Sequence, residues 1–407
     1  MSVDKALELF LKHPSLKKPD EIDISIEDAY GMIISQDIIS PEDLPGFNRS
    51  TVDGFAVNSS NTFGATESIP SYLLIKTEIF MGEKPDCKIE KGEAAKIATG
   101  GMLPEGANSV VMLEHTQQID EKMIEVVKPV APGENVIQAG EDTKKDDLIL
   151  HRGRRLKPQD IGALAGIGIT NIRVFEKPKV SIISTGDEII PPHKHLGHGQ
   201  IRDINSYTLS GLILNAGGVP LKKGIFSDKY EILRDIVEKS LIDSQMVLIS
   251  GGSSVGTKDI TAKVINDLGE PGVLFHGVSL KPGKPTVGGI INSLPIFGLP
   301  GHPAAVSVSF EILVKPVLEE LSGLYKNIFN NEKNRVMAKI SKNISSSPGR
   351  QEHIPVALEK RDGQIWAVPI LGKSGLITTL TKADGTFVIP LRKLGVQKGE
   401  TIEVRLF

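Results

Sequence analysis

The spacing of apolar residues changes several times along this chain of 407 residues. Apolar positions recur every three or four residues from Val3 to Leu11, which predicts a short amphipathic helix. Ser25 and Asp28 have the spacing of a helix-capping box and predict a second short helix over 29–34. Between residues 55 and 135, short apolar runs are broken by Gly and Pro, a pattern typical of strands. We expect these strands at 72–80, 94–98, 109–113 and 123–127.

A different pattern begins at residue 179, where apolar runs alternate with helical periods. We expect strands at 180–183, 218–221, 246–249, 273–275 and 295–297. One helical period covers 209–216, where Gly217 is placed to end the helix, and another covers 232–237, behind a capping pair of Asp228 and Glu231. A last helix over 304–321 contains Pro316, which should interrupt it. This alternation predicts a three-layer α/β domain with a mostly parallel sheet.

The helical period ends near residue 326, and the rest of the chain is typical of a small β-barrel or sandwich. Strands are expected at 336–340, 353–358, 364–369, 386–391 and 401–406, with hairpin turns at Asp362-Gly363 and Asp384-Gly385. We therefore expect a multidomain α/β-plus-β chain. Its domains are a discontinuous N-terminal and connecting domain (1–54 and 136–178), a β-rich inserted domain (55–135), the α/β domain (179–326) and a C-terminal β-barrel domain (327–407).

Composition narrows the classes of partner. The 47 Lys and Arg residues nearly balance 50 Asp and Glu, and without a basic stripe we expect no nucleic-acid partner. The single cysteine, Cys87, excludes a disulfide within the chain and agrees with a reducing compartment. No apolar run reaches 18 residues and the N-terminus does not resemble a signal peptide, so we expect a cytoplasmic protein without a membrane partner.

Candidate chemistry lies in turns that directly follow strands of the α/β domain. Ser184 to Glu188 follow the first strand, and the Gly- and Ser-rich segment 250–259 follows the third. Ligands of open parallel sheets bind beyond the carboxyl ends of the strands, where glycines let backbone N–H groups approach an anion. Each turn alone could be a tight connection, and Asp187 or Asp259 alone could cap a helix. Several such turns on one sheet, however, predict an anion-binding edge. The chain has neither a P-loop nor a dinucleotide fingerprint.

Two proline-stiffened segments add positive charge. Lys281-Pro282-Gly283-Lys284-Pro285 holds two lysines in a rigid loop, which suits a phosphate or another oxyanion, although alone it could be a solvated loop. The segment 298–304 precedes a helix whose N-terminus could bind an anion, and we interpret its His302 as structural.

Taken in order, the segments 184–188, 250–256, 281–285 and 298–303 resemble the molybdopterin-binding domain, which molybdopterin adenylyltransferases and CinA-type proteins also contain. Three further segments resemble the MoeA and gephyrin E-domain family: Asn48-Arg49-Ser50-Thr51-Val52-Asp53-Gly54-Phe55, the run Ile97 to Asn108, and Gly140-Glu141-Asp142. This resemblance covers essentially the whole chain. It implies a homodimer in which the α/β domain of one subunit faces the 55–135 domain of the other. The implied reaction converts adenylylated molybdopterin and molybdate into the molybdenum cofactor, with release of AMP.

The family resemblance also implies which residues act. The candidate catalytic residues are Asp53, Asp142, Glu188, Asp228, Asp259, Lys281 and Lys284. The candidate substrate-binding residues are Thr99, Gly100, Ser184, Thr185, Gly186, Asp187, Asp203, Asn205, Ser206, Gly251, Gly252, Ser254, Gly256, Pro300, Pro303, Arg350 and Ser374. The carboxylates among these residues would repel anionic substrates unless a cation compensated them. We therefore expect Mg²⁺, bound by Asp228 and Asp259. The two lysines would neutralise molybdate or the terminal phosphate of the pterin.

Three alternatives compete with this interpretation. Adenylylation of molybdopterin requires a separate or fused α/β domain, and CinA-type pyrophosphatases usually begin with that domain, whereas here about 178 residues precede it. A non-catalytic molybdopterin-binding scaffold or carrier has no physical need of these carboxylates and lysines in one cleft. Expected partners are small-molecule substrates, a molybdopterin adenylyltransferase and acceptor molybdoenzymes. The chain departs from the family pattern at His302, Ser253 and Thr51-Val52. Its segment 348–353 keeps the family-like Gly349-Arg350 but lacks the second arginine that follows in the family pattern.

Overall fold

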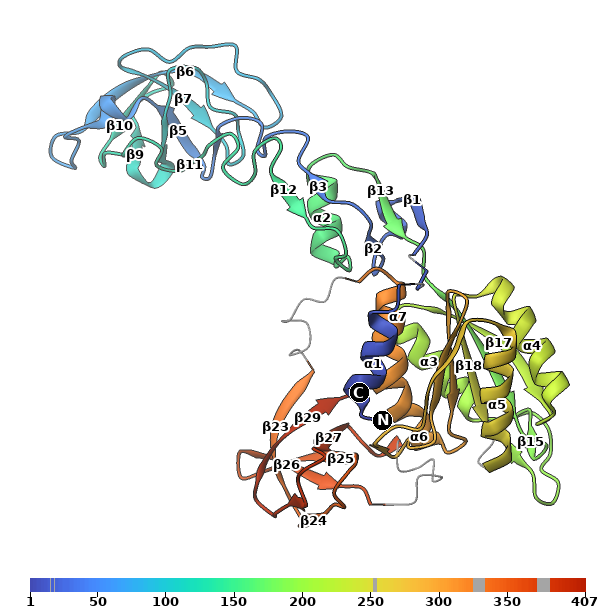
Figure 1. Cartoon of the computed structure of the whole chain (residues 1–407). Helices are drawn as coiled ribbons and strands as arrows, with labels where there is room; N and C mark the ends of the chain where they lie inside the picture. The colour runs from blue at the N-terminus through green and yellow to red at the C-terminus, as the bar shows by residue number, and fades with distance from the viewer. Residues whose placement is uncertain (15, 18, 252–254, 325–333, 372–380) are drawn as a thin grey trace. The chain divides into compact units, whose positions relative to one another are not determined.

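A computed structural model describes residues 1–14, 16, 17, 19–251, 255–324, 334–371 and 381–407 (Figure 1). Internal contacts divide the chain into two compact units. The first contains Met1–Gln36, Arg152–Lys157 and Asn171–Phe407, and the second contains Asp37–His151 and Pro158–Thr170. Helices long and apolar enough to span a membrane do not occur in the described part of the chain.

The second unit contains a six-stranded sheet in the order β8-β5-β7-β6-β10-β9. Its strands are β5 (Gly54–Val57), β6 (Ser71–Ile79), β7 (Glu93–Ile97), β8 (Ser109–Met112), β9 (Thr116–Gln118) and β10 (Met123–Val126). Four of them confirm the strands expected from residues 72–127. The short helices η2 (Ser59–Thr62) and η3 (Leu113–His115) lie in the connections between strands of this sheet. Phe55, Leu73 and Ile124 are buried in its core.

Two short pairs of antiparallel strands lie where the chain enters and leaves this sheet. β4 (Arg49–Ser50) pairs with β11 (Val136–Ile137), and β3 (Ile38–Ile39) pairs with β12 (Leu148–Leu150). Helix α2 (Pro158–Gly166) follows.

The predicted helix over 29–34 is wrong. Ser25 does act as a cap, but for the single 3₁₀ turn η1 (Ile26–Asp28), whose Glu27 N–H donates to the Ser25 hydroxyl. Gly31 then adopts a left-handed conformation, with φ of +75°, which ends any helical path. The next residues form β2 (Ile33–Ile34), which joins the three-stranded sheet β1-β13-β2 with β1 (Glu21–Ser25) and β13 (Asn171–Phe175).

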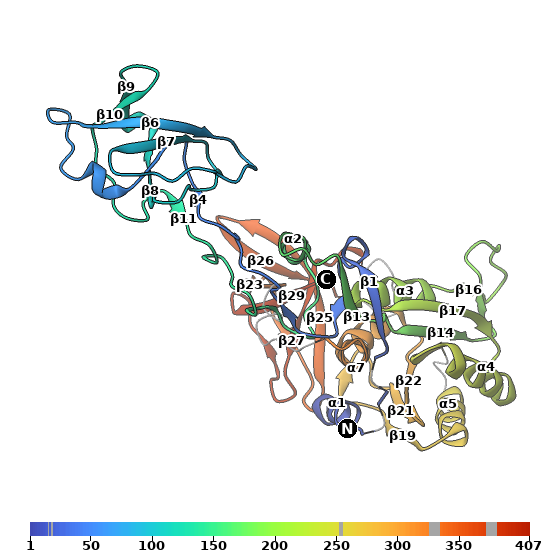
Figure 2. The same cartoon turned by 90° about the horizontal axis from the view of Figure 1, so that it is seen from above.

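In the first unit, the expected three-layer α/β domain is confirmed. Its sheet has the order β17-β14-β18-β22-β21-β19 (Figure 2). The strands are β14 (Lys179–Thr185), β17 (Val219–Phe226), β18 (Met246–Gly251), β19 (Pro271–His276), β21 (Val287–Ile291) and β22 (Leu294–Leu299). The pairs among β17, β14, β18 and β22 are parallel, and β21, which the sequence analysis missed, is antiparallel to both of its neighbours.

Helices cover both faces of this sheet. On one face, α4 (Tyr230–Asp243) and α5 (Val255–Leu268) pack on the side chains of β14 and β18. On the other lie α3 (Asn205–Ala216), α6 (Pro303–Ser309) and α7 (Lys315–Leu321). A π-helical turn, η4 (Phe310–Val314), separates α6 from α7 just before Pro316, which confirms the expected interruption. As predicted, α3 ends at Gly217, whose φ is +93°.

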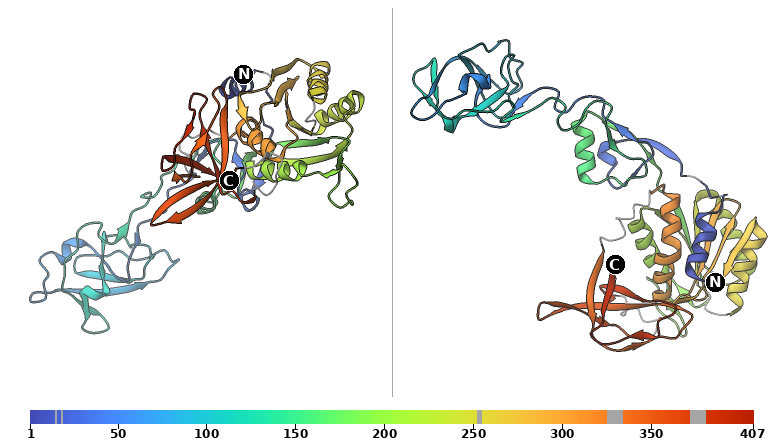
Figure 3. Two further views of the ribbon diagram at one scale, coloured as in Figure 1. Left: turned by 90° about the horizontal axis from the view of Figure 1, so that it is seen from below. Right: turned by 60° about the vertical axis from the view of Figure 1, so that its left-hand side comes forward.

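The N-terminal helix α1 (Val3–Leu11) is confirmed, but it packs within the α/β core although the sequence analysis assigned residues 1–54 to another domain. Phe10 is only 1% exposed and stacks on Phe297 at 4.7 Å between ring centroids. Phe275 meets the same ring edge-on. The helix lies beside α7 (Figures 1 and 3). The apolar face of α1 therefore completes the layer formed by α3, α6 and α7.

The C-terminal segment forms the expected β-barrel. Its strands are β23 (Arg335–Ile340), β25 (Gln351–Arg361), β26 (Gln364–Pro369), β27 (Gly385–Ile389) and β29 (Thr401–Leu406), and the β25–β27 pairing closes it. The short strands β24 (Ile344–Ser345) and β28 (Gly395–Val396) pair outside it. Asp362-Gly363 forms the predicted hairpin turn. The predicted turn at Asp384-Gly385 is wrong, because Gly385 begins β27, close to the Arg405 carbonyl.

Candidate functional site

The backbones of β14 and β18 lie so close together at their carboxyl ends that a side chain would not fit between them. Thr185 pairs with Gly251, whose φ is +145°. A Cβ atom at Gly251 would lie 1.9 Å from the Thr185 carbonyl oxygen, so only glycine fits there. Ser184, Thr185, Gly186 and Gly251 therefore meet at one edge of the sheet, as the sequence analysis expected.

Three other candidates form a buried network behind this edge. The Ser184 hydroxyl donates to Asp203 Oδ2 at 2.9 Å, and the Ser206 N–H donates to Asp203 Oδ1 at 3.1 Å. Asn205 Nδ2 donates to Ser250 Oγ at 2.9 Å and to the Gly301 carbonyl at 2.8 Å. These bonds tie both strand ends to the start of α3 and to the loop before α6. Asp203, Asn205 and Ser206 are almost fully buried, so they hold the edge in shape rather than present a surface to a ligand.

Asp187 and Glu188 lie at the same edge and are exposed. The Glu188 carbonyl accepts a hydrogen bond from Ile201, at the ladder of β15 (Ile189–Ile190) and β16 (Ile201–Arg202). Their carboxylates are therefore available to a ligand that binds beyond the strand ends.

The predicted capping role of Asp228 is wrong, because α4 is capped at Lys229 and makes no side-chain cap bond there. Asp228 lies between β17 and α4, while the exposed Asp259 lies in the first turns of α5. The two elements are adjacent, since Lys263 Nζ lies 4.6 Å from the ring centroid of Tyr230, whose hydroxyl donates to Asp267 at 2.5 Å. Lys263 follows Asp259 by one helical turn, so both aspartates lie near this contact.

Among the described residues, no group of three or more His, Cys, Asp or Glu side chains could hold a metal ion. Two carboxylates alone would leave most coordination positions to water and to substrate phosphates. That arrangement fits Mg²⁺, which keeps several waters and is seldom enclosed by protein ligands.

A cleft of about 1570 Å³ lies between the α/β domain and the barrel, both in the first unit. The loop 281–285 lines it, together with Pro300, His302, Pro303 and Arg350. The loop is held at both ends. Thr286 Oγ1 donates to the Gly283 carbonyl at 2.7 Å, and β20 (Leu280–Lys281) pairs with the start of β25. The cleft thus brings both candidate lysines and Arg350 together, but the strand ends at Ser184 to Glu188 do not line it.

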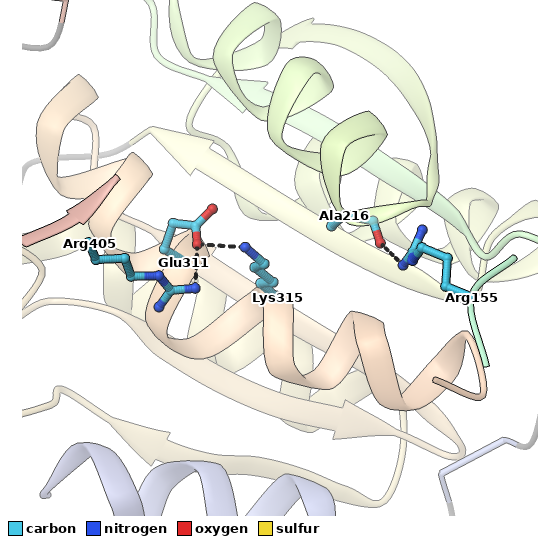
Figure 4. Close-up of polar contacts among 5 residues, drawn as sticks. All are labelled: Arg155, Ala216, Glu311, Lys315 and Arg405. Atoms are coloured by element: carbon cyan, nitrogen blue, oxygen red, sulfur yellow. Dashed lines mark hydrogen bonds and ion pairs between the residues drawn. The ribbon is translucent and has the colours of Figure 1, made fainter. Parts of the chain in front are cut away.

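Most cations of this cleft are already neutralised. Seven lysine and arginine side chains line it: Lys281, Lys284, Lys315, Arg335, Arg350, Lys393 and Arg405. Five of them form ion pairs with Glu311, Glu352, Glu400 or Glu403. Glu311, for example, accepts from Lys315 at 2.9 Å and from Arg405 at 3.3 Å (Figure 4). Within the described part of the chain, the cleft cations that form no ion pair are Lys284 and Arg350, both candidates from the sequence.

His353 also lines the cleft, and the sequence analysis missed it. Burial, and secondarily the charge of Arg405, lower the pKa of His353 to about 4, so its imidazole is neutral near pH 7. Its Nε2 lies 3.0 Å from Gln351 Nε2. Glu311 and Glu352 were missed too. Their place in the cleft does not show in the local sequence, because Arg405, which pairs with Glu311, and Lys281, which pairs with Glu352, lie far along the chain.

In the second unit, the three N-terminal family segments meet. Thr99 donates to Asp53 Oδ1 through its N–H at 2.7 Å and its hydroxyl at 2.9 Å. These bonds, the backbone bond first, hold the pKa of Asp53 below the usual aspartate value. Gly100 donates to the Ser50 carbonyl, and the N–H of Asp142 donates to the Leu44 carbonyl. Asp53 and Asp142 are both exposed. This unit therefore presents two exposed carboxylates on a hydrogen-bonded frame.

Three candidate residues lie outside the described part of the chain: Gly252, Ser254 and Ser374. Gly256 belongs to the first turn of α5.

Glycine-rich strand ends, together with a cleft in which Lys284 and Arg350 form no ion pair with a described residue, are typical of multidomain α/β proteins that bind anionic small molecules. Comparison with known sequences identifies the family. Residues 1–168 match the MoeA N-terminal region (domain I and II), 181–320 match a probable molybdopterin binding domain, and 337–407 match the MoeA C-terminal region (domain IV). The chain belongs to the MoeA family.

Individual relatives match over nearly their whole length. A putative molybdopterin biosynthesis protein of Methanocaldococcus jannaschii is 37% identical, with 96% of this chain and 92% of that protein aligned. A molybdopterin molybdenumtransferase of a Nostoc species is 30% identical, with 98% and 92% aligned. The crystal structure of a molybdopterin biosynthesis MoeA protein from Pyrococcus horikosii matches with a TM-score of 0.84 and 39% identity, covering 100% of this chain and 98% of that one.

Proposed function

We propose that the protein is a molybdopterin molybdenumtransferase. It inserts molybdate into adenylylated molybdopterin, releases AMP in a Mg²⁺-dependent reaction and yields the molybdenum cofactor. The observation that carries the proposal is the cleft in which Lys284 and Arg350 have no carboxylate partner among the described residues. Relatives from Bacillus subtilis and Nostoc that carry this enzyme name support the same reaction.

The binding groups divide between the sheet edge and the cleft. At the edge, the backbone near Gly186 and the loop 251–256, with the hydroxyls of Ser184 and Thr185, suit the phosphates of the pterin nucleotide. In the cleft, Lys281, Lys284 and Arg350 suit the oxyanion, and Pro300 and Pro303 line the same space. Ser374, which lies outside the described residues, would bind the same oxyanion. Substrate contacts from Thr99 and Gly100 would come from the second unit.

The carboxylates have separate tasks. Asp228 and Asp259 would hold Mg²⁺, which when bound neutralises charge on the pyrophosphate and the departing AMP. Asp187 and Glu188 are exposed at the strand ends and would orient the pterin dithiolene and the incoming metal. Asp53 and Asp142 would complete the site from the partner subunit of a homodimer. The enzyme would act in the cytoplasm, between a molybdopterin adenylyltransferase and acceptor molybdoenzymes.

Replacement of Asp259 tests this assignment. Asp259→Ala should reduce AMP release from adenylylated molybdopterin by at least about a hundredfold, while circular dichroism and dimer mass stay unchanged. Asp235→Ala is the matched control, because Asp235 is exposed on the neighbouring helix α4, where it pairs with Lys239. An unchanged rate in Asp259→Ala would sink the metal assignment. Tight pterin binding without any AMP release by the wild type would favour a scaffold or carrier.

A further inference from the structure

Within the described part of the chain, Lys281 is the one candidate cation of the cleft that has an anionic partner. Its Nζ lies 2.7 Å from Glu352 Oε1, and the two residues pair in register between β20 and β25. Lys281 remains 48% exposed, whereas the side chain of Glu352 is only 13% exposed. The carboxylate is thus fixed under the loop, while the ammonium still faces the cleft.

A second bond fixes Glu352. The Ser346 hydroxyl donates to Glu352 Oε2 at 2.7 Å, so the two carboxylate oxygens have different partners. The backbone below is also held, because Ser279 accepts from the Gln351 N–H at 3.0 Å and donates to the Met1 carbonyl at 2.7 Å. Glu352 is therefore a preorganised acceptor rather than a mobile surface carboxylate.

We propose that Glu352 is a positioning residue that competes with the bound oxyanion for Lys281 and so sets how tightly the cleft holds molybdate. This inference rests on the proposed function. Without an oxyanion, Lys281 lies on Glu352, and Lys284 and Arg350 provide the unpaired charge. When the oxyanion binds, it shares the Lys281 ammonium with Glu352. The attraction of Lys281 to the Glu352 carboxylate opposes its attraction to the oxyanion. Glu352 therefore lowers the affinity of the cleft for the oxyanion and favours release of the oxyanion for transfer.

The sign of this effect separates it from a simple structural role. Glu352→Gln keeps the shape of the side chain but removes the negative charge next to Lys281. Its amide oxygen can still accept from Lys281, and its amide N–H can donate to the Ser346 hydroxyl in place of the bond that the hydroxyl now donates. Molybdate binding to the full-length protein, measured by isothermal titration calorimetry, should tighten about three- to tenfold. A purely structural Glu352 would give weaker binding instead, because Lys281 would lose its place.

Glu311→Gln is the matched control. Glu311 lines the same cleft and pairs with Lys315 and Arg405, but not with the loop 281–285 (Figure 4). Its replacement frees Lys315 and Arg405 but no residue of the loop 281–285, so it should tighten molybdate binding less than Glu352→Gln does. A double-mutant cycle adds a second control, since Lys281→Gln/Glu352→Gln should bind no more tightly than Lys281→Gln.

Several results would overturn the inference: unchanged or weaker binding in Glu352→Gln, equal tightening in Glu311→Gln, or tightening that persists without Lys281. If Glu352→Gln failed to fold, Glu352→Asp, whose carboxylate is one methylene further from Lys281, should tighten binding in the same direction. A wild-type protein that binds no molybdate would overturn the proposed function as well, whereas wild-type binding without tightening in the variant would overturn this inference alone.

Discussion

At the scale of single residues, fixed partners decide which charges of this protein can reach a ligand. Among the described residues, seven lysine and arginine side chains line the cleft, and five of them are neutralised by glutamates, which leaves Lys284 and Arg350. In the second unit, Thr99 lowers the pKa of Asp53 by donating two hydrogen bonds to one oxygen. Burial keeps His353 neutral. The reactivity expected of each group therefore depends on its neighbours as much as on its own chemistry.

Thr99→Val should raise the pKa of Asp53 part of the way to the usual aspartate value. The backbone N–H, the larger cause of the lowered pKa, remains, and only the hydroxyl donor is lost. A carboxyl whose pKa is lowered on folding stabilises the fold above its unfolded pKa, and this contribution disappears as pH falls through its folded pKa. Carboxyl ¹³C NMR titration would measure the change. Thr116→Val is the control, because Thr116 donates to the Leu113 carbonyl and should leave Asp53 unaffected.

His353 should make the protein less stable as the pH falls from about 6.5 to about 4. Its folded pKa of about 4 lies below the ordinary histidine value, so the unfolded chain binds an extra proton in that window. The loss should approach about 3 kcal/mol of unfolding free energy.

Urea unfolding between pH 4.5 and 7 tests this prediction. Glu and Asp residues contribute equally to the wild type and to His353→Gln, so the difference in slope belongs to the histidine. His353→Gln should flatten the slope, and replacement of the exposed His198 should not. Equal slopes in the wild type and His353→Gln would contradict the burial argument.

At the scale of elements, Arg155 links the segment 152–157 to the C-terminus of α3 within the first unit. Arg155 Nη2 donates to the Ala216 carbonyl at 3.1 Å, at the C-terminus of α3 (Figure 4). Burial lowers the pKa of Arg155, while the charge of Glu319 acts the other way. A cation at this position satisfies a carbonyl that the helix itself cannot pair and favours the negative end of the helix dipole.

Arg155→Ala should lower the free energy of unfolding by about 1–3 kcal/mol, because a partly buried, charged hydrogen bond to a helix end is lost. Arg173→Ala is the control. Arg173 pairs with Asp23 at 3.1 Å on an exposed surface, where solvent screens the pair, so its loss should cost much less stability. Denaturant melts of both variants would measure the difference, and equal losses would argue against a helix-capping role for Arg155.

The sequence predicts elements well where periodicity is strong and poorly where backbone conformation decides. The parallel strands β14, β18 and β22 and the barrel strands follow from apolar runs. The helix expected over 29–34 fails because Gly31 turns left-handed and Ile33 and Ile34 pair with β13. β21 was missed because its Val287-Gly288-Gly289 start does not resemble a strand. Its glycines are needed where Phe275 and the Gly272 carbonyl approach.

The candidate site divides in the same way. The glycine turns, the lysine loop and Arg350 could be chosen from the sequence because their residue types and order are distinctive. Glu352, Glu311 and His353 could not, since their importance comes from partners such as Lys281 and Arg405 that lie far away in the sequence.

At the scale of the whole molecule, the candidate residues are divided between the two units. Asp53 and Asp142 belong to the second unit, whereas Asp228, Asp259 and the lysine loop belong to the first. A homodimer whose sites combine the first unit of one subunit with the second unit of the other would unite them. In such a homodimer, Asp53→Ala would remove a side chain that the second unit contributes to each site. Asp259→Ala would remove one that the first unit contributes.

Mixed dimers test this arrangement. Each variant alone should be inactive, but subunits exchanged by mild denaturation and refolding should regain about a quarter of wild-type activity, because half of the dimers contain one intact site of two. If the mixture stays inactive although heterodimers are present by mass spectrometry, the shared-site arrangement is wrong.

The central claim is that this chain joins molybdate to adenylylated molybdopterin. Its most direct test is to measure AMP release by the purified protein with and without molybdate and Mg²⁺, and to add the product to an apo-molybdoenzyme. If the protein catalyses this reaction, AMP release requires both ions and the product activates the apo-enzyme. Release that ignores molybdate, or tight pterin binding with no AMP formed, would contradict it.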